Sequence, residues 1–328
     1  MPRHLPPQLP RHIVQGGFIL FFLWIGTRFY QWEVAVAMTG SAPFPRPDAV
    51  DGFLPISGLM NLRFWLQSGE LFPVHPAAAL IMLAALLTGL LLKRGFCSWI
   101  CPVFTLGEGL WRLGHKLFGR NFIPPFWIDL PLRSLKYLLL AFFLYATLLA
   151  MPLPALQAFL GDPYHQIVDV RMLHFFTDPS ATVLSFVAVL IVLSLFVKLP
   201  WCRYLCPYGA LLGLVSMASL GKIRRNPEKC VRCNACSHRC PASLPVMLKE
   251  TVRSAECFAC YRCVAGCPEP GALDFTMARR WVIPPLLFAL LLLSLFIGID
   301  LYGRWSDRWH SGVTDQQVMR LLQPVERP

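Results

Sequence analysis

The chain has 328 residues, of which 55% are hydrophobic and only 15% are charged. This composition is typical of a membrane protein and argues against a chain that spends its length on a large water-soluble core. Because the formal net charge of +12 accompanies this strong hydropathy, it indicates membrane topology and excludes nucleic-acid binding as its explanation.

Five apolar segments approach the roughly 20 residues that are needed to cross a hydrocarbon core of about 30 Å. Only a helix satisfies its backbone groups within one such segment, so the sequence predicts an all-α transmembrane bundle of about five helices. The segments are residues 13–32, 74–92, 135–153, 181–199 and 281–301. Arg28 and Glu33 interrupt the approach to the cleavage-like sequence at residues 35–37, which favours a retained span over a removed signal peptide.

The distribution of basic residues predicts the orientation of the bundle. Residues 1–12, 93–136 and 198–280 contain 22 of the 30 Lys and Arg residues but only 7 of the 18 acidic residues. Lys and Arg collect on the cytoplasmic side of membrane proteins. We therefore expect these stretches to be cytoplasmic, with the N-terminus inside and the C-terminus outside, in a multi-pass protein of the bacterial inner (cytoplasmic) membrane.

Residues 93–106 and 198–211 repeat one another at an offset of 105 and share a C-x3-C-P motif. Each copy follows a segment that is expected to run inward, so the two halves are predicted to be parallel repeats. The four motif cysteines are Cys97, Cys101, Cys202 and Cys206. Proline favours the first helical position, which puts Cys101 and Cys206 near N-caps, where the helix dipole is expected to lower a thiol pKa. A further metal centre, reversible disulfides and inert packing thiols all remain open interpretations.

Two more cysteine runs have the spacing C-x2-C-x2-C-x3-C-P and repeat at an offset of 27. In two-cluster ferredoxins with this spacing, the fourth cysteine of each run ligates the other [4Fe-4S] cluster. By that pattern one cluster has the ligands Cys230, Cys233, Cys236 and Cys267, and the second has Cys257, Cys260, Cys263 and Cys240. Structural zinc sites are the alternative, but these usually use two separated C-x2-C pairs.

These features predict four regions along the chain. Residues 1–72 contain the first transmembrane helix and an outer loop, and residues 73–221 contain a transmembrane core with both C-x3-C-P motifs. Residues 222–280 form a small inserted α+β ferredoxin-like domain with two [4Fe-4S] clusters on the cytoplasmic side. Residues 281–328 contain the last transmembrane helix and a periplasmic tail.

With its motifs in this order, the chain from about residue 73 to about residue 302 resembles the NapH, MauN, NosR and CcoG group of membrane iron-sulfur proteins. The resemblance implies electron transfer between the quinone pool and an unidentified redox protein, as in the membrane subunit of a quinol dehydrogenase. It also implies contact with membrane lipids. Two alternatives are a metal-ion or disulfide reductase or assembly factor that uses the C-x3-C-P cysteines, and a redox-sensing regulator.

A quinol site would need a proton acceptor and polar groups at the membrane interface. Residues 53–66 are expected to form an interfacial amphipathic helix in the first outer loop. The candidate side chains, each also interpretable as an ordinary interfacial residue, are Arg63, Glu70, His75, His165, Asp169 and His174. No catalytic set is assigned from them. The sequence has no C-x-x-C-H for attached c-type haem and no nucleotide-binding glycine motif.

Overall fold

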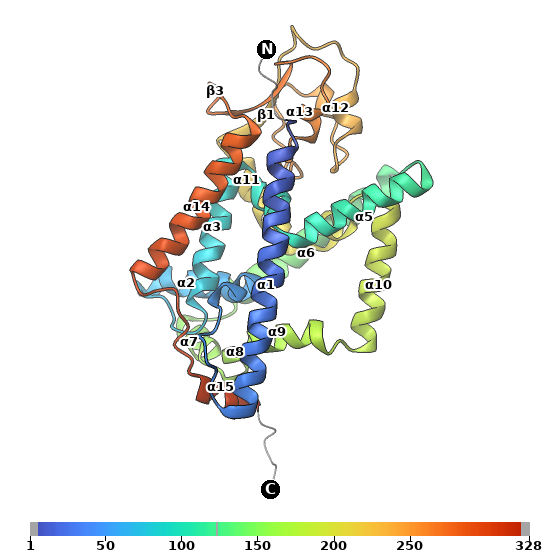
Figure 1. Cartoon of the computed structure of the whole chain (residues 1–328). Coiled ribbons are helices and arrows are strands. Elements are labelled where there is room, and N and C mark those ends of the chain that lie inside the picture. Colours follow the sequence, from blue (N-terminus) through green and yellow to red (C-terminus); the bar gives the residue numbers. More distant parts are fainter. Residues whose placement is uncertain (1–5, 123, 323–328) are drawn as a thin grey trace. The chain divides into compact units, whose positions relative to one another are not determined.

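The computed structural model describes residues 6–122 and 124–322, which are mostly helical (Figure 1). The chain divides into two compact units. Unit 1 has the described residues of Met1–Ile19, Ala85–Leu140 and Phe186–Leu295, and unit 2 has those of Leu20–Ala84, Ala141–Ser185 and Phe296–Pro328. Both C-x3-C-P motifs and the ferredoxin-like segment therefore belong to unit 1.

The α-helices are α1 (Leu9–Thr39), α2 (Pro55–Ser68), α3 (Pro76–Leu92), α4 (Gly95–Trp99), α5 (Pro102–Phe118), α6 (Phe126–Leu144), α7 (Leu153–Leu160), α8 (Pro163–Gln166), α9 (Val168–Thr177), α10 (Ala181–Phe196), α11 (Pro207–Met217), α12 (Ala235–His238), α13 (Arg262–Ala265), α14 (Pro285–Trp305) and α15 (Asp315–Leu322). Short 3-10 helices are η1 (Asp48–Phe53) and η4 (Val246–Leu248), and π-helical turns are η2 (Tyr145–Leu149) and η3 (Trp201–Leu205). Strands β1 (Gly221–Arg225), β2 (Leu273–Met277) and β3 (Trp281–Val282) form an antiparallel sheet in the order β1-β2-β3.

Within the described residues, three helices are long and apolar enough to cross a membrane: Leu9–Thr39, Trp127–Leu149 and Pro285–Trp305. Helices α9 and α10 are bent by 70° at their junction and add a fourth span if the pair counts as one. Helix α3 has only 17 residues, or about 26 Å of helix. The five predicted segments fall mostly on apolar helices, while the number and direction of the spans remain predictions.

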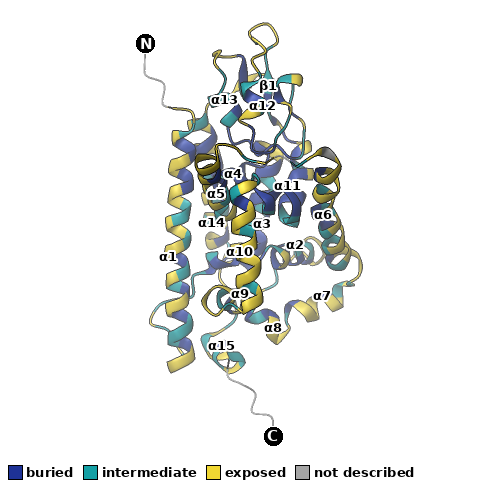
Figure 2. Ribbon diagram, turned by 90° about the vertical axis from the view of Figure 1, so that its right-hand side faces the viewer, coloured by how far each residue is buried: buried dark blue, intermediate teal, exposed yellow. Residues whose placement is uncertain are grey.

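The apolar helices carry large hydrophobic side chains on their surfaces. Most residues of α10 are exposed, as the yellow ribbon in Figure 2 shows. On α6, Trp127 is 85% exposed and Phe142 is 63% exposed. Because a water-soluble protein rarely exposes so much contiguous apolar surface, these helices are suited to lipid.

Unit 2 has its main core along the second half of α1. Phe29, Trp32 and Val36 are buried there against residues of η1, α9 and α15, including Val170 and Val318. Helix α2 packs on α7 through the buried residues Met60, Phe64, Leu156 and Leu160. This helix covers residues 55–68, where the sequence predicted a helix over residues 53–66.

Unit 1 has a buried aromatic core that joins the sheet to the start of α14. The rings of Trp99 and Phe288 stack with centroids 4.8 Å apart, and Tyr261 and Phe275 contact Phe288 edge-on at 5.3 and 5.2 Å. Tyr261 lies within the second cysteine run and is 1% exposed. The aromatic core thus holds that cysteine loop against the helices of unit 1.

Candidate iron-sulfur sites

The two ferredoxin-type cysteine runs have the same backbone conformation. In both, the residues on either side of the second cysteine are left-handed. Arg232 and Asn234 flank Cys233 with φ of 54° and 60°, and Ala259 and Tyr261 flank Cys260 with φ of 52° and 56°. A one-turn helix, α12 or α13, then begins immediately before the third cysteine of each run. The repeat at an offset of 27 is therefore present in the backbone as well as in the sequence.

This backbone conformation fits an anionic iron-sulfur cluster. Residues of alternating handedness point successive N–H groups to one side of the chain, which forms a concavity that binds anions, including iron-sulfur clusters. A left-handed non-glycine residue costs roughly 1–2 kcal/mol. Four such residues at matching positions are explained if the loops enclose a bound anionic group, since strain of this kind gathers at binding sites.

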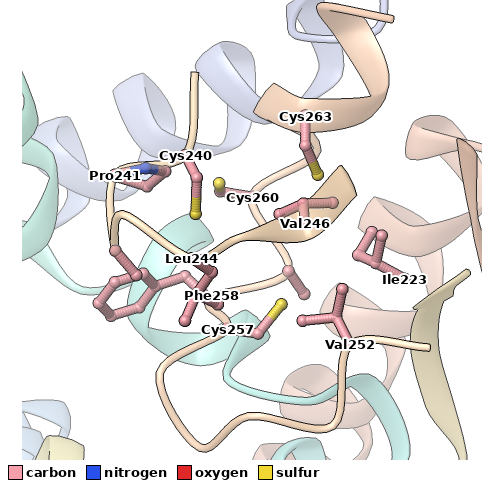
Figure 3. Close-up of a pocket in the computed structure, with 12 residues that line it drawn as sticks. Ile223, Cys240, Pro241, Leu244, Val246, Val252, Cys257, Phe258, Cys260 and Cys263 are labelled. Carbon is pink, nitrogen blue, oxygen red and sulfur yellow. The ribbon is translucent and has the colours of Figure 1, made fainter. Parts of the chain in front are cut away.

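One pocket of unit 1 is lined by four cysteines, Cys240, Cys257, Cys260 and Cys263. Figure 3 shows that their sulfur atoms face a common space. Much of the remaining lining is apolar, with Ile223, Leu244, Val246, Val252 and Phe258 among its side chains. The structure thus brings together the ligand set in which Cys240 comes from the first run and the other three cysteines come from the second.

The other four cysteines also lie together across the two runs. Burial raises the pKa of the Cys267 thiol, and the nearby Cys233, Cys236 and Cys230 raise it further. Cys236 is buried, Cys230 and Cys267 are partly buried, and Cys233 is exposed. This set is therefore closer to solvent than the pocket of Cys240, Cys257, Cys260 and Cys263.

A single zinc ion is the alternative occupant of each cysteine set. Structural zinc sites usually use two separated C-x2-C pairs. The tandem C-x2-C-x2-C-x3-C-P runs instead have the spacing that is typical of [4Fe-4S] clusters.

The C-x3-C-P motifs form helix starts, as their prolines predicted. Cys101 is the N-cap of α5 and Cys206 is the N-cap of α11, with proline next in each case. The backbone N–H of Gly209 donates to Cys206 Sγ at 3.2 Å. A side chain at Gly209 would place its Cβ 2.8 Å from Arg94 Nη2, so glycine allows this arginine to approach the motif.

The expected lowering of the thiol pKa values in these motifs is wrong. Burial raises the pKa of Cys101 to about 12 and also raises the pKa values of Cys202 and Cys206. Backbone N–H groups at both helix starts act in the predicted direction, but desolvation of the thiolate outweighs them. Such thiols stay protonated unless a cation such as a metal ion binds them.

The four motif cysteines lie close enough for each thiolate charge to act on the others, and Arg94 lies among them. Arg94 is 1% exposed, and its Nη1 donates to the carbonyl of Ala255 at 3.1 Å. Its guanidinium lies over the ring of Phe258, 4.4 Å from the centroid. Because Phe258 directly follows Cys257, Arg94 connects the C-x3-C-P cysteines with the second ferredoxin-type run.

The first C-x3-C-P motif binds the second ferredoxin-type run directly. Ser98 Oγ donates to the carbonyl of Phe258 at 2.6 Å, and Trp99 Nε1 donates to the carbonyl of Ala259 at 3.2 Å. In the second motif the matching positions are Arg203 and Tyr204, and both bind Asp129 of α6. The two repeats therefore keep the same cysteine placement but have different partners.

Unit 2 contains a separate buried charged cluster formed by Arg46, Asp48, Asp51, His75 and Asp169. Arg46 donates to Asp51 at 2.6 Å and to Asp169 at 2.7 Å, and lies 3.1 Å from His75 Nδ1. Asp51, His75 and Asp169 each have an atom that could bind a metal ion, and these atoms lie within 4.8 Å of one another. The Arg46 guanidinium contacts all three side chains. Arg46 therefore neutralises these carboxylates in the place where a metal ion would do so.

Of the side chains considered for a quinol site, three lie together. His75 Nε2 is 3.0 Å from the carbonyl of His165, and the His165 ring is 3.2 Å from Ser57 Oγ. Burial lowers the pKa of His165 to about 4, and Asp169 completes the group through Arg46. The remaining candidates are elsewhere: Arg63 donates to the carbonyl of Thr147, Glu70 is exposed, and His174 is 3.4 Å from Glu33.

The sequence reading missed several charged residues next to the cysteine sites. Glu108 and Asp129 are the only acidic residues in the basic stretch 93–136. Glu108 binds Arg11, and Asp129 binds Arg203. The presence of an acidic residue in a mostly basic stretch could have indicated that it pairs with an arginine. For Arg94 and Arg46, no spacing in the sequence shows which distant residues they meet.

Together these features define a membrane protein with a ferredoxin-type iron-sulfur segment, and comparisons with known proteins agree. A family described as "4Fe-4S binding domain" matches residues 74–121 and 180–226, and one described as "4Fe-4S dicluster domain" matches residues 222–268. The first covers the two C-x3-C-P regions and the second covers both ferredoxin-type runs.

Similar proteins carry electron-transport or ferredoxin-type names. The putative electron transport protein YccM of Escherichia coli K12 is 43% identical over 311 residues, which cover 93% of this chain and 85% of YccM. The ferredoxin-type protein NapH of the same strain is 30% identical over 233 residues, 68% of this chain and 74% of NapH. The methylamine utilization ferredoxin-type protein MauN of Paracoccus denitrificans is 34% identical over 196 residues, 57% of this chain and 63% of MauN. No solved structure matches the chain.

The chain belongs to the polyferredoxin-type family of 4Fe-4S electron-transfer proteins that includes YccM and NapH.

Proposed function

We propose that this protein transfers electrons between the quinone pool and a redox partner through two [4Fe-4S] clusters. The observation that carries the proposal is the crossed grouping of the cysteines. Cys240 lies with the second run in one pocket, and Cys267 lies with the first run. When bound, [4Fe-4S] clusters accept and release single electrons.

The chain contributes the surroundings of both clusters. The left-handed residues beside Cys233 and Cys260 would offer N–H groups to a bound cluster, and hydrogen bonds of this kind help to set the reduction potential. The site of Cys240, Cys257, Cys260 and Cys263 is called the inner site, and apolar side chains such as Val246 and Val252 keep water from it. Because Cys233 is exposed, the set of Cys230, Cys233, Cys236 and Cys267 is the one that a soluble redox protein can approach.

We assign a further metal centre to Cys97, Cys101, Cys202 and Cys206. Two observations support it. The raised pKa values of three of these thiols disfavour disulfide exchange, which needs a thiolate. In addition, Arg94 Nε is buried beside them with no hydrogen-bond partner in the described residues. Through Arg94 and Phe258, this centre would exchange electrons with the inner cluster first.

We further propose a multi-pass topology in the inner membrane, with the ferredoxin-like segment in the cytoplasm and the chain oriented N-in and C-out. The basic stretches around this segment support that orientation. The exposed apolar surfaces of α6 and α10 would contact lipid. Quinones dissolve in the same bilayer, so the quinone pool is an electron carrier that is accessible to these helices.

Serine substitutions test the crossed ligand sets, with paramagnetic resonance of the reduced, anaerobically purified chain as the readout. If the sets are crossed, Cys240→Ser removes the same signal as Cys260→Ser, and Cys267→Ser removes the same signal as Cys233→Ser. If each run instead holds its own cluster, Cys240→Ser will match Cys233→Ser and the crossed assignment is wrong.

A second experiment separates quinol-linked transfer from metal-ion reduction. Cluster reduction by an added quinol analogue supports the proposed function. If quinol has no effect, while copper(II) oxidises the reduced clusters in a way that is lost in a Cys97→Ser, Cys202→Ser double variant, the protein is a metal-ion reductase instead.

A further inference from the structure

A buried arginine of the first helix lies against the inner cluster site in unit 1. The Arg11 side chain is 0% exposed. Its Nε donates to Gln8 Oε1 at 3.0 Å, and Gln8 Nε2 donates to the carbonyl oxygen of Cys260 at 3.0 Å. The start of α1 is therefore hydrogen-bonded to the backbone of a proposed cluster ligand.

The surroundings of Arg11 carry a net positive charge. Arg11 Nη2 donates to both carboxylate oxygens of Glu108, at 2.6 and 2.7 Å, and Arg262 Nε donates to Glu108 at 2.7 Å. Burial alone would raise the pKa of Glu108, but Arg11 and Arg262 lower it to about 2. Two guanidinium groups thus face one ionised carboxylate, beside the loop between Cys260 and Cys263.

One nitrogen of Arg11, Nη1, is buried and makes no hydrogen bond to any residue that the structure describes. Leaving a buried charged donor unpaired is costly. Gln8 connects Arg11 to the Cys260 backbone through two hydrogen bonds of 3.0 Å. A negatively charged sulfur site at Cys260 would therefore be a nearby acceptor of matching charge.

We propose that Arg11 sets the reduction potential of the cluster at Cys240, Cys257, Cys260 and Cys263, by donating its free Nη1 N–H to the sulfur site and holding a buried positive charge there. This inference rests on the proposed cluster at that site. The reduced form of a cluster carries one more negative charge than the oxidised form, so a nearby cation and an N–H donor stabilise it and raise the potential. The first helix is then part of the redox site as well as a membrane anchor.

Two substitutions with opposite effects on local charge test the inference. In the full chain, Arg11→Gln removes a positive charge, and we expect the midpoint potential of one cluster to fall. Glu108→Gln removes a negative charge but keeps an acceptor oxygen for both arginines, and we expect the same midpoint to rise. A tenfold change in the reduction equilibrium, about 59 mV for a one-electron couple, is the size sought. Redox titration followed by paramagnetic resonance measures it.

Arg112→Gln is the matched control, because Arg112 lies on α5 with Glu108 but is exposed, where water screens its charge. It should leave both midpoints unchanged. Damage to the fold would shift the midpoint potentials of Arg11→Gln and Glu108→Gln in the same direction, and that result would overturn the inference. An unchanged midpoint potential in Glu108→Gln would also overturn it. If Arg11→Gln fails to fold, Glu108→Gln alone decides. A wild-type chain with no [4Fe-4S] signal would instead overturn the proposed function itself.

Discussion

His75 shows at the scale of a single residue how a buried charge is supported in unit 2. Its Nδ1 is 3.0 Å from Asp51 Oδ1, and its Nε2 is 3.0 Å from the carbonyl of His165. A doubly protonated ring donates to both. Burial alone would lower the pKa of His75, but the Asp51 carboxylate raises it above its ordinary value. Burial would likewise raise the pKa of Asp51, but Arg46 and His75 lower it.

These opposite shifts predict the pH dependence of stability. A raised folded-state pKa means that the contribution of His75 is complete below about pH 6.5 and is lost as the pH rises through that pKa. The lowered pKa of Asp51 makes its contribution complete above about pH 4, and it is lost as the pH falls through the folded-state value. The pair is therefore most stabilising between these limits. The wild type should therefore lose stability as the pH rises above about 6.5. We expect the His75→Gln variant to lose less stability over the same pH range.

Thermal unfolding of the detergent-purified chain across this pH range measures the effect. His115→Gln is the matched control, because His115 is exposed on α5 in unit 1, and it should retain the wild-type profile. A His75→Gln profile parallel to that of the wild type would contradict the assigned charge. Asp51→Asn should destabilise unit 2 by about 3 kcal/mol, since it leaves Arg46 and His75 without their shared carboxylate.

At the scale of elements, α5 and α10 pack through a glycine in unit 1. A Cβ at Gly114 would lie 1.8 Å from the carbonyl oxygen of Leu195, whereas a Cβ at Gly109 on the same helix would meet nothing within 4 Å. We expect Gly114→Ala to destabilise the protein by about 1–3 kcal/mol, as overpacking does. Gly109→Ala should stabilise it by up to about 1 kcal/mol through helix propensity. Unfolding temperatures that change alike in both variants would show that the helices do not approach this closely.

The elements that the sequence predicted well depend on local spacing. The ferredoxin-type loops and the helix starts at Cys101 and Cys206 follow from residues within one or two turns of each other. The predicted lowering of the thiol pKa values was wrong because desolvation of a thiol depends on segments far away in the sequence. The apolar segment at residues 74–92 was predicted from composition alone. Its helix is short because His75 and Lys93, with φ of 54° and 55°, lie at its two ends.

The charged clusters were the least predictable part of the sites. His75, His165 and Asp169 were candidates from their place in outer loops, but Arg46 and Asp51, which hold them, were not. Nothing in the spacing of Arg11 and Glu108 indicates their contact, since 97 residues separate them. Such pairs form only when helices far apart in the chain pack together, so one sequence does not reveal them.

At the scale of the whole molecule, the proposed orientation can be tested with two introduced cysteines and a membrane-impermeant maleimide. Ser68→Cys lies in the predicted outer loop, and His115→Cys lies in a predicted cytoplasmic stretch. Both positions are exposed. In intact spheroplasts we expect labelling above the wild-type background only at position 68, and labelling at position 115 only after the membrane is permeabilised. The reverse pattern would show that the ferredoxin-like segment is on the outside.

Two [4Fe-4S] clusters in the ferredoxin-type runs are the central claim, and it is tested most directly by quantifying iron, acid-labile sulfide and reduced-state paramagnetic resonance in the anaerobically purified chain. We predict about eight irons and eight sulfides per chain from the ferredoxin-type runs, with two interacting [4Fe-4S] signals. Additional iron should be lost when Cys97 and Cys202 are replaced by serine. Stoichiometric zinc without sulfide, or a reduced sample that gives no signal, would contradict the account.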